Sequence, residues 1–125
     1  MRLKNILLVV DDIEKSIAFY KELFGLQVLK HFDGNVILTE GLVLQDRKIW
    51  ESLIGQKVSC GSNASELYFV ENNLEEFQRK LEESSFEIRY VHKLKEYDWG
   101  QKAIRIYDLD GHMIEIGETP EAWNS

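Results

Sequence analysis

The sequence predicts an α+β fold in which two βαβββ modules form a curved mixed sheet with helices on its outer face. Three observations lead to this prediction. The same order of elements, a strand, a helix and three strands, occurs twice along the 125 residues. Each predicted helix follows an Asp or Asn that can accept its first free amide hydrogens. Each module also contains an Asp-Gly pair, Asp33-Gly34 and Asp110-Gly111, of the kind found in hairpin turns.

The first module covers about residues 3–46 of a chain that we expect to be one domain, residues 1–125. Residues 4–10 are aliphatic and β-branched and too short for a helix, which indicates a strand. Asp12 is expected to cap a helix from about Ile13 to Phe24, with Gly25 at its end. The apolar stripe of this helix is predicted at Ile13, Ile17, Tyr20 and Phe24. Strands are expected at about 26–32, 35–39 and 41–45.

The second module, about residues 65–118, follows a connection at about 47–64. Ile49, Trp50 and Leu53 predict one or two amphipathic helical turns within that connection. In the module, residues 66–70 form a predicted strand. Asn73 and Glu76 have the spacing of a capping box at the start of a helix. Three further strands are expected at about 86–93, 102–107 and 112–117.

The composition argues against several classes of partner. A formal net charge of −7 is unsuited to nucleic acids and anionic membranes, and no apolar run approaches the roughly 20 residues of a membrane span. Cys60 is the single cysteine, so no intrachain disulfide can form. The N-terminus lacks the cleavage site of a signal peptide. We therefore expect a soluble cytoplasmic protein with neither nucleic acid nor membrane as its partner.

Two stretches of the sequence carry a family resemblance. The first runs from Val10-Asp11-Asp12 to Tyr20 and ends in Leu23-Phe24-Gly25-Leu26, and the second is Tyr107-Asp108-Leu109-Asp110-Gly111-His112-Met113-Ile114-Glu115-Ile116. Both resemble the signatures of the vicinal oxygen chelate superfamily (glyoxalase, bleomycin resistance protein and dioxygenase), with Leu109 where proline is usual. Trp99-Gly100-Gln101 is similar to small bacterial members with no assigned reaction. The resemblance implies the fold and leaves the function open, because the same fold serves metal enzymes and metal-free drug-binding proteins.

The resemblance also implies where the family's four metal ligands, usually His, Glu, His and Glu, fall in this chain. The positions are Asn5, Gln45, Glu66 and Glu115. Both histidines are therefore replaced, and Asn is a weak ligand for the transition metals that imidazole binds well. Such a set can still hold a hard cation such as Mg²⁺. We expect no metal site of the histidine type, with a divalent cation as a remaining possibility, and we expect all four residues to line one hollow.

Further candidates are placed near this hollow. Carboxylates are costly to bury unpaired, so Glu66 and Glu115 either pair internally, with Arg105 as the candidate partner, or bind a cation, a ligand amine or a transferring proton. Tyr68 shares the face of Glu66 by strand alternation. Trp99 and Trp50 lie in or near connections, where flat side chains often cover ligands, although Trp50 also fits core packing. His31, His92 and His112 do not fall on ligand positions and are assigned no role.

Two functions fit these residues. The first is a small-molecule-binding protein like the bleomycin-resistance members, whose ligand contacts Asn5, Gln45, Tyr68, Trp99 and Arg105. The second is a lyase- or isomerase-type enzyme in which Glu66 and Glu115 act as acid–base groups or as ligands of a hard cation. The missing histidines and the acidic charge favour binding, whereas the retained carboxylates favour catalysis. A homodimer is expected in either case, because open sheet edges favour pairing.

Overall fold

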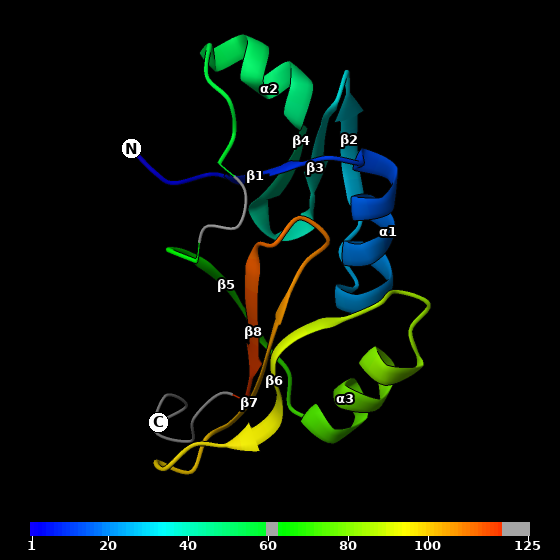
Figure 1. The fold of residues 1–125 in the computed structure, drawn as a ribbon, viewed down its shortest axis with the longest axis vertical. Helices are drawn as coiled ribbons and strands as arrows, with labels where there is room; N and C mark the ends of the chain where they lie inside the picture. Colours follow the sequence, from blue (N-terminus) through cyan, green and yellow to red (C-terminus); the bar gives the residue numbers. More distant parts are fainter. Residues whose placement is uncertain (60–62, 119–125) are drawn as a thin grey trace. The chain divides into compact units, whose positions relative to one another are not determined.

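The structure, a computed structural model, describes residues 1–59 and 63–118, so that Cys60 lies outside the described residues. The chain divides into two compact units, Met1–Cys60 and Gly61–Ser125. This division falls inside the predicted connection at 47–64. Each unit contains a strand, a helix and three further strands, as the repeat predicts (Figure 1).

The first module forms a four-stranded mixed sheet. Its elements are β1 (Ile6–Val10), α1 (Ile13–Phe24), β2 (Val28–Phe32), β3 (Asn35–Leu38), a 3-10 turn (Thr39–Gly41), β4 (Leu42–Asp46) and α2 (Arg47–Ile54). The strand order is β1-β4-β3-β2, with β1 parallel to β4 and the other pairs antiparallel. The predicted turn at Asp33-Gly34 is confirmed, since both residues have positive φ, 47° and 79°, as a two-residue hairpin turn requires.

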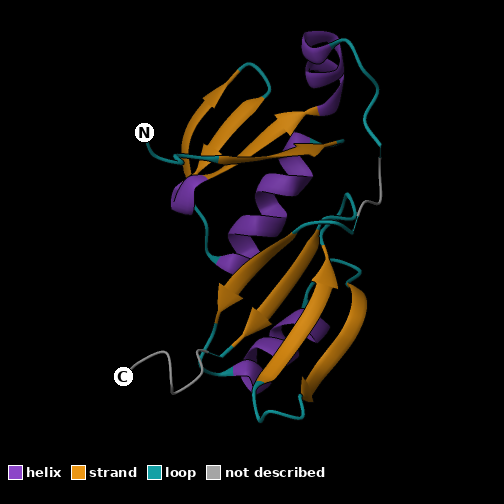
Figure 2. Cartoon of the chain, turned by 90° about the vertical axis from the view of Figure 1, so that its left-hand side faces the viewer, coloured by secondary structure: helices purple, strands orange, loops and turns teal. Residues whose placement is uncertain are grey.

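The second module repeats this topology. Its elements are β5 (Glu66–Val70), α3 (Leu74–Glu83), β6 (Arg89–Glu96), β7 (Lys102–Tyr107) and β8 (Met113–Gly117). The strand order is β5-β8-β7-β6, with β5 parallel to β8. Figure 2 shows this sheet with its own helix, α3, behind it, so that α3 leaves the other face uncovered. We call that other face the open face of the second module.

The helix caps follow the sequence prediction with one difference. The Asp12 side chain accepts the backbone N–H of Lys15, and the Asn73 side chain accepts that of Glu76, each at 3.1 Å. The Glu76 carboxylate does not complete the capping box in the usual way. It accepts from the Asn73 side-chain amide at 3.0 Å, while Glu71 accepts the Asn73 backbone N–H at 3.3 Å. A nearer carboxylate therefore takes the position that Glu76 was expected to fill.

Three other expectations need correction. The buried positions of α1 are Ser16, Phe19, Tyr20 and Leu23, whereas Ile13, Ile17 and Phe24 are only half-buried. Apolar residues lie on several sides of this helix, so periodicity alone did not select the buried stripe. Strand β6 begins at Arg89 and ends at Glu96, three residues later than the predicted 86–93. Asp110-Gly111 lies in a longer turn between the paired residues Tyr107 and Met113, in which Asp108 accepts the backbone N–H groups of Asp110 and His112.

Each module has its own apolar core on the helix side of its sheet. In the second module this core consists of Leu74, Phe77, Leu81, Ile104, Ile106, Ile114 and Ile116. The strand residues of this core alternate with those of the open face, because successive side chains of a strand point to opposite faces.

In the first module, α2 is capped by Asp46, whose side chain accepts the Ile49 N–H at 3.0 Å. Within residues 1–59 and 63–118, every helix is too short or too polar to cross a membrane.

Candidate functional site

The open face of the second module is built from three rows of residues that lie side by side on the four strands. The register places Tyr68, Glu115, Arg105 and His92 in the middle row. One neighbouring row is Glu66, Met113, Tyr107 and Arg89, and the other is Val70, Gly117, Ala103 and Lys95. Charged groups therefore lie at the centre of this face.

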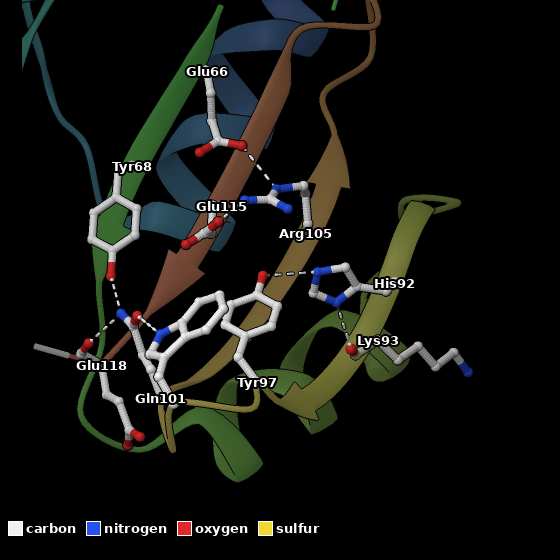
Figure 3. A network of polar contacts seen from close by, with 10 residues as sticks. Glu66, Tyr68, His92, Lys93, Tyr97, Gln101, Arg105, Glu115 and Glu118 are labelled. Atoms are coloured by element: carbon white, nitrogen blue, oxygen red, sulfur yellow. Dashed lines mark hydrogen bonds and ion pairs between the residues drawn. The ribbon is translucent and has the colours of Figure 1, made fainter. Parts of the chain in front are cut away.

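Arg105 connects the two carboxylates of this face. Its Nε donates to Glu66 Oε2 at 2.8 Å, and its Nη2 donates to Glu115 Oε2. Figure 3 shows both carboxylates turned toward the guanidinium. The predicted pairing of Arg105 with Glu66 and Glu115 is therefore confirmed. Two carboxylates around one guanidinium leave a formal charge of −1 on these three residues. Two further cations lie in the neighbouring rows, Arg89 over the Tyr107 ring and Lys95 over the Tyr97 ring.

The two carboxylates differ in their access to solvent. The Glu115 side chain is 10% exposed, whereas those of Glu66 and Arg105 are 30% and 27% exposed. Glu115 lies on the inner strand β8, between β5 and β7, while Glu66 begins the edge strand β5. The sheet therefore shields Glu115 from both sides. A ligand can therefore reach the Glu66 carboxylate more easily than the Glu115 carboxylate, which lies on an inner strand.

A second group of polar contacts connects Tyr68 to the β6–β7 turn. The Gln101 amide donates to the Tyr68 hydroxyl at 2.9 Å and to the Glu118 carbonyl at 3.1 Å. Its carbonyl oxygen accepts the indole N–H of Trp99 at 3.0 Å. One glutamine side chain thus joins strand β5, the residue after β8 and the turn (Figure 3).

Tyr97 extends this group toward β6. Its ring stacks on that of Trp99, with centroids 4.6 Å apart and an interplanar angle of 29°. Its hydroxyl lies 3.2 Å from His92 Nε2, and His92 Nδ1 lies 2.9 Å from the Lys93 carbonyl. Since a carbonyl only accepts, His92 Nδ1 is the donor to Lys93. We call Tyr68, Gln101, Trp99, Tyr97 and His92 the aromatic row.

Tyr68 lies across the sheet rather than away from it. A Cβ added at Gly117 would come 2.4 Å from the Tyr68 hydroxyl oxygen, so the absence of a side chain there makes room for the ring. Desolvation raises the pKa of the Tyr68 hydroxyl, and the hydrogen bond from Gln101 opposes this rise. The side chain is two-fifths exposed overall. The desolvation acts on its hydroxyl end, which is enclosed by Gly117 and Gln101.

The first module places its two candidate residues differently. Gln45 is 5% exposed, and its side-chain carbonyl accepts from the Asn35 amide at 2.7 Å. Val9 is its register partner on β1, and Asn5 lies just before this strand, four residues ahead of Val9. In the second module the partner of Glu115 is Tyr68, and Glu66 precedes Tyr68 by two residues. At about 3.3 Å per residue, Asn5 is offset from Gln45 by about 13 Å along the strand, against about 7 Å for Glu66 and Glu115.

The structure therefore brings Glu66, Glu115 and Arg105 into contact, and adds Tyr68 and Trp99 through Gln101. Asn5 and Gln45 do not form a comparable cluster. Trp50 is half-buried on α2 in the first module. The convergence of all four candidate positions on one hollow depends on how the two modules are placed and stays a prediction.

The residues at these positions are a poor match to a divalent metal centre. The guanidinium of Arg105 already holds both carboxylates, and the Gln45 carbonyl is held by Asn35. A cation at Oε2 of either glutamate would have to displace Arg105. In the part of the chain that the structure describes, no three His, Cys, Asp or Glu residues lie close enough together to hold one ion.

Three members of the aromatic row, His92, Tyr97 and Gln101, were not identified from the sequence. His92 was assigned no role, yet it is the register partner of Arg105. The register of β6 against β7 shifts on both sides of His92, and no sequence pattern specifies such a shift. The alternation of Tyr97, Trp99 and Gln101 was the available signal, and a turn between the strands obscured it.

Fold and site together define a two-module protein of the vicinal oxygen chelate superfamily. The sequence model of the glyoxalase-like domain matches residues 3–121, and the chain therefore belongs to that family. No curated protein is a significant match.

Solved structures agree with this assignment. A protein of unknown function from Agrobacterium tumefaciens str. C58 is 30% identical, with a TM-score of 0.78 over 95% of this chain and 94% of that chain. A glyoxalase-related enzyme from Fulvimarina pelagi is 21% identical, with a TM-score of 0.78 over 95% and 88%. A glyoxalase/bleomycin resistance protein/dioxygenase superfamily member from Sphaerobacter thermophilus DSM 20745 is 19% identical, with a TM-score of 0.69 over 95% and 98%. The last two are similar to this chain in fold alone.

Proposed function

We propose that this chain is a small-molecule-binding member of its family, and that its ligand binds on the open face of the second module through a cationic group. One observation supports this proposal above all others. Glu66 and Glu115 share a single guanidinium on a sheet face without a helix, which leaves one negative charge on the cluster. A ligand cation at Glu66 would balance that charge.

The two carboxylates differ in exposure, and this difference determines which of them a ligand contacts. Glu66 is three times as exposed as Glu115, with side-chain exposures of 30% and 10%. A ligand ammonium would take the place of Arg105 Nε at Glu66, while Arg105 keeps Glu115. Because the guanidinium stays paired throughout, the exchange never leaves a buried charge alone.

The test is a thermal-shift measurement with small aliphatic ammonium cations and carboxylates of matched size. A ligand that binds only the folded state raises the melting temperature, and the stabilisation grows with the logarithm of 1 + [L]/Kd. We expect ammonium ions to raise it in the wild type and to lose this effect in Glu66→Gln. Glu115→Gln should lose it too, because Arg105 would then be held by Glu66 alone.

Glu75→Gln is the matched control. It removes one carboxylate from the same module, and its partner is Lys102 on the solvent-exposed surface. Its response to ammonium ions should equal that of the wild type. If Glu66→Gln and Glu75→Gln respond alike, the ligand does not bind at the cluster and the proposal is wrong.

A second candidate function is a lyase- or isomerase-type enzyme that uses Glu66 and Glu115 as acid–base groups. The observation in its favour is that one carboxylate is shielded and the other accessible, an arrangement that can separate their roles in proton transfer. A hard-cation site at the same residues would compete with Arg105. Metal analysis of protein purified without chelator distinguishes these cases, and we expect no stoichiometric metal. Tightly bound metal at one ion per chain would favour the metal-dependent enzyme.

We further propose that the chain forms a homodimer. Strand β2 is at the edge of its sheet, with every residue exposed, and it presents Val28, Leu29 and Phe32 to solvent. Exposed apolar edge strands tend to pair with other chains. Light scattering should give twice the mass of the 14.7 kDa chain. A monomer at micromolar concentration would contradict this part of the proposal.

A further inference from the structure

Trp99 is exposed and yet held in place. The residue is 72% exposed, the largest exposed fraction of any described aromatic residue. One face of its indole stacks on Tyr97, and its N–H is bonded to Gln101. Fixing an exposed side chain costs conformational entropy, which the contacts that hold it must offset. At this exposure most of the indole surface remains accessible.

The restraints on Trp99 come from the candidate site itself. Gln101, which accepts the indole N–H, also donates to the Tyr68 hydroxyl. Tyr68 is the register partner of Glu115, which accepts from Arg105. The indole is therefore fixed relative to the carboxylate cluster by two consecutive hydrogen bonds and one strand pairing. Tyr97 is restrained from the other side, through its contact with His92.

We propose that the aromatic row is a stacking subsite for a planar ring, and that the ligand of the open face is an aromatic cation. This inference rests on the proposed function and specifies its ligand class. The accessible surface of the indole is available to a flat ring, and the ring quadrupole favours one that is electron-poor or cationic. The unbalanced charge of the Glu66–Arg105–Glu115 cluster favours the same charge sign. A neutral aliphatic molecule would satisfy neither feature.

Gln101 is a positioning residue in this arrangement. It contacts Trp99 and Tyr68 but is not expected to touch the ring of the ligand. Its contribution is to keep the indole in one orientation before the ligand arrives, which lowers the entropy lost on binding. Its removal should weaken the binding of planar cations and leave that of compact ammonium ions unchanged.

The experiment compares N-methylquinolinium with tetramethylammonium, which has the same charge and no ring. We expect N-methylquinolinium to quench the tryptophan fluorescence of the wild type and to bind about tenfold more tightly than tetramethylammonium. Trp99→Ala should remove this preference, and Trp99→Phe should retain part of it. Gln101→Ala should reduce it severalfold, with the melting temperature of the free protein little changed. Trp50→Phe, in the first module, is the matched control and should bind as the wild type does.

The outcomes separate the two proposals. If tetramethylammonium binds in a Glu66-dependent manner and the ring adds no affinity, the stacking subsite is wrong and the proposed function stands. If quinolinium binding depends on Trp99 and is unaffected by Glu66→Gln, the subsite stands and the proposed cation site is wrong. Equal quinolinium affinity in the wild type and Trp99→Ala, or no binding of either cation, overturns the subsite.

Discussion

The two modules share one topology but differ in the chemistry of the sheet face opposite the main helix. In the first module the register pairs Asn35 with Gln45, and in the second it pairs Arg105 with Glu115. Gln45 and Glu115 are buried to the same degree, 5% and 7% exposed. The difference between them is therefore charge and not access.

The paired side chains of the first module are therefore neutral, whereas those of the second module carry a net formal charge. The Asn35 amide donates to the Gln45 side-chain carbonyl at 2.7 Å, and the Gln45 amide donates to the Asp46 backbone carbonyl at 3.4 Å, without a net charge. Arg105 pairs with both Glu115 and Glu66, so that the three side chains together carry a formal charge of −1. A repeated scaffold can thus keep a structural pair in one copy and a binding cluster in the other, through changes at single register positions.

The largest expected effect comes from removing the shared guanidinium. Arg105→Met leaves Glu66 and Glu115 without a partner, and we expect a loss of about 2–3 kcal/mol in the free energy of unfolding at neutral pH, because a broken buried pair leaves an uncompensated charge. Urea unfolding measures it. The loss should shrink at high ionic strength, because salt screens the repulsion between the two carboxylates that remain. A loss that does not change with salt would show that Arg105 contributes through packing alone.

The corresponding change in the first module should lower the free energy of unfolding by less, and by an amount that does not depend on pH. Asn35→Ala removes the partner of the Gln45 carbonyl, and we expect a loss of about 1–2 kcal/mol, the cost of leaving a buried neutral acceptor unsatisfied. Because neither amide titrates, the loss should be the same at pH 5 and pH 8. A pH-dependent loss would contradict the interpretation of Asn35 and Gln45 as a neutral pair.

The contact between Tyr68 and Gly117 distinguishes the second module further. Gly117→Ala places a methyl group where the Tyr68 hydroxyl lies, and we expect a loss of about 1 kcal/mol, at the low end for overpacking because the exposed tyrosine can swing away. In a Tyr68→Ala background the same substitution should cost almost nothing. A double-mutant cycle gives this coupling, and additive effects would mean that Tyr68 does not lie over Gly117.

The smallest effect concerns the ionisation of Tyr68. Desolvation raises the pKa of its hydroxyl in the folded protein above that in the unfolded chain. The folded state then holds this proton more tightly, so Tyr68 adds stability below its unfolded pKa, and this contribution is lost as the pH rises through the folded pKa. Ultraviolet titration of the wild type minus that of Tyr68→Phe should show a phenolate transition above about pH 10. A transition below this value would contradict the enclosed hydroxyl.

The sequence was a good guide to elements whose signals are local. Helix α1 has the predicted bounds, Ile13–Phe24, because an Asp cap and a glycine stop mark its ends directly. The pairing of Arg105 with both carboxylates also followed from alternation and from the cost of an unpaired buried charge. By contrast, the shifted start of β6 and the buried stripe of α1 depend on packing partners that lie elsewhere in the chain.

The amino-acid sequence by itself determined the repeated order of elements, the family and the replacement of both ligand-type histidines, since each is a property of residue identity and spacing. Tertiary structure decided which candidates meet. Strand register pairs Tyr68 with Glu115, and Glu66 lies two residues before Tyr68. It pairs Val9 with Gln45, whereas Asn5 lies four residues before Val9. It also brings His92 beside Arg105. Register depends on hydrogen bonds between segments far apart in the chain and on bulges that shift them, so no local pattern of residues specifies it.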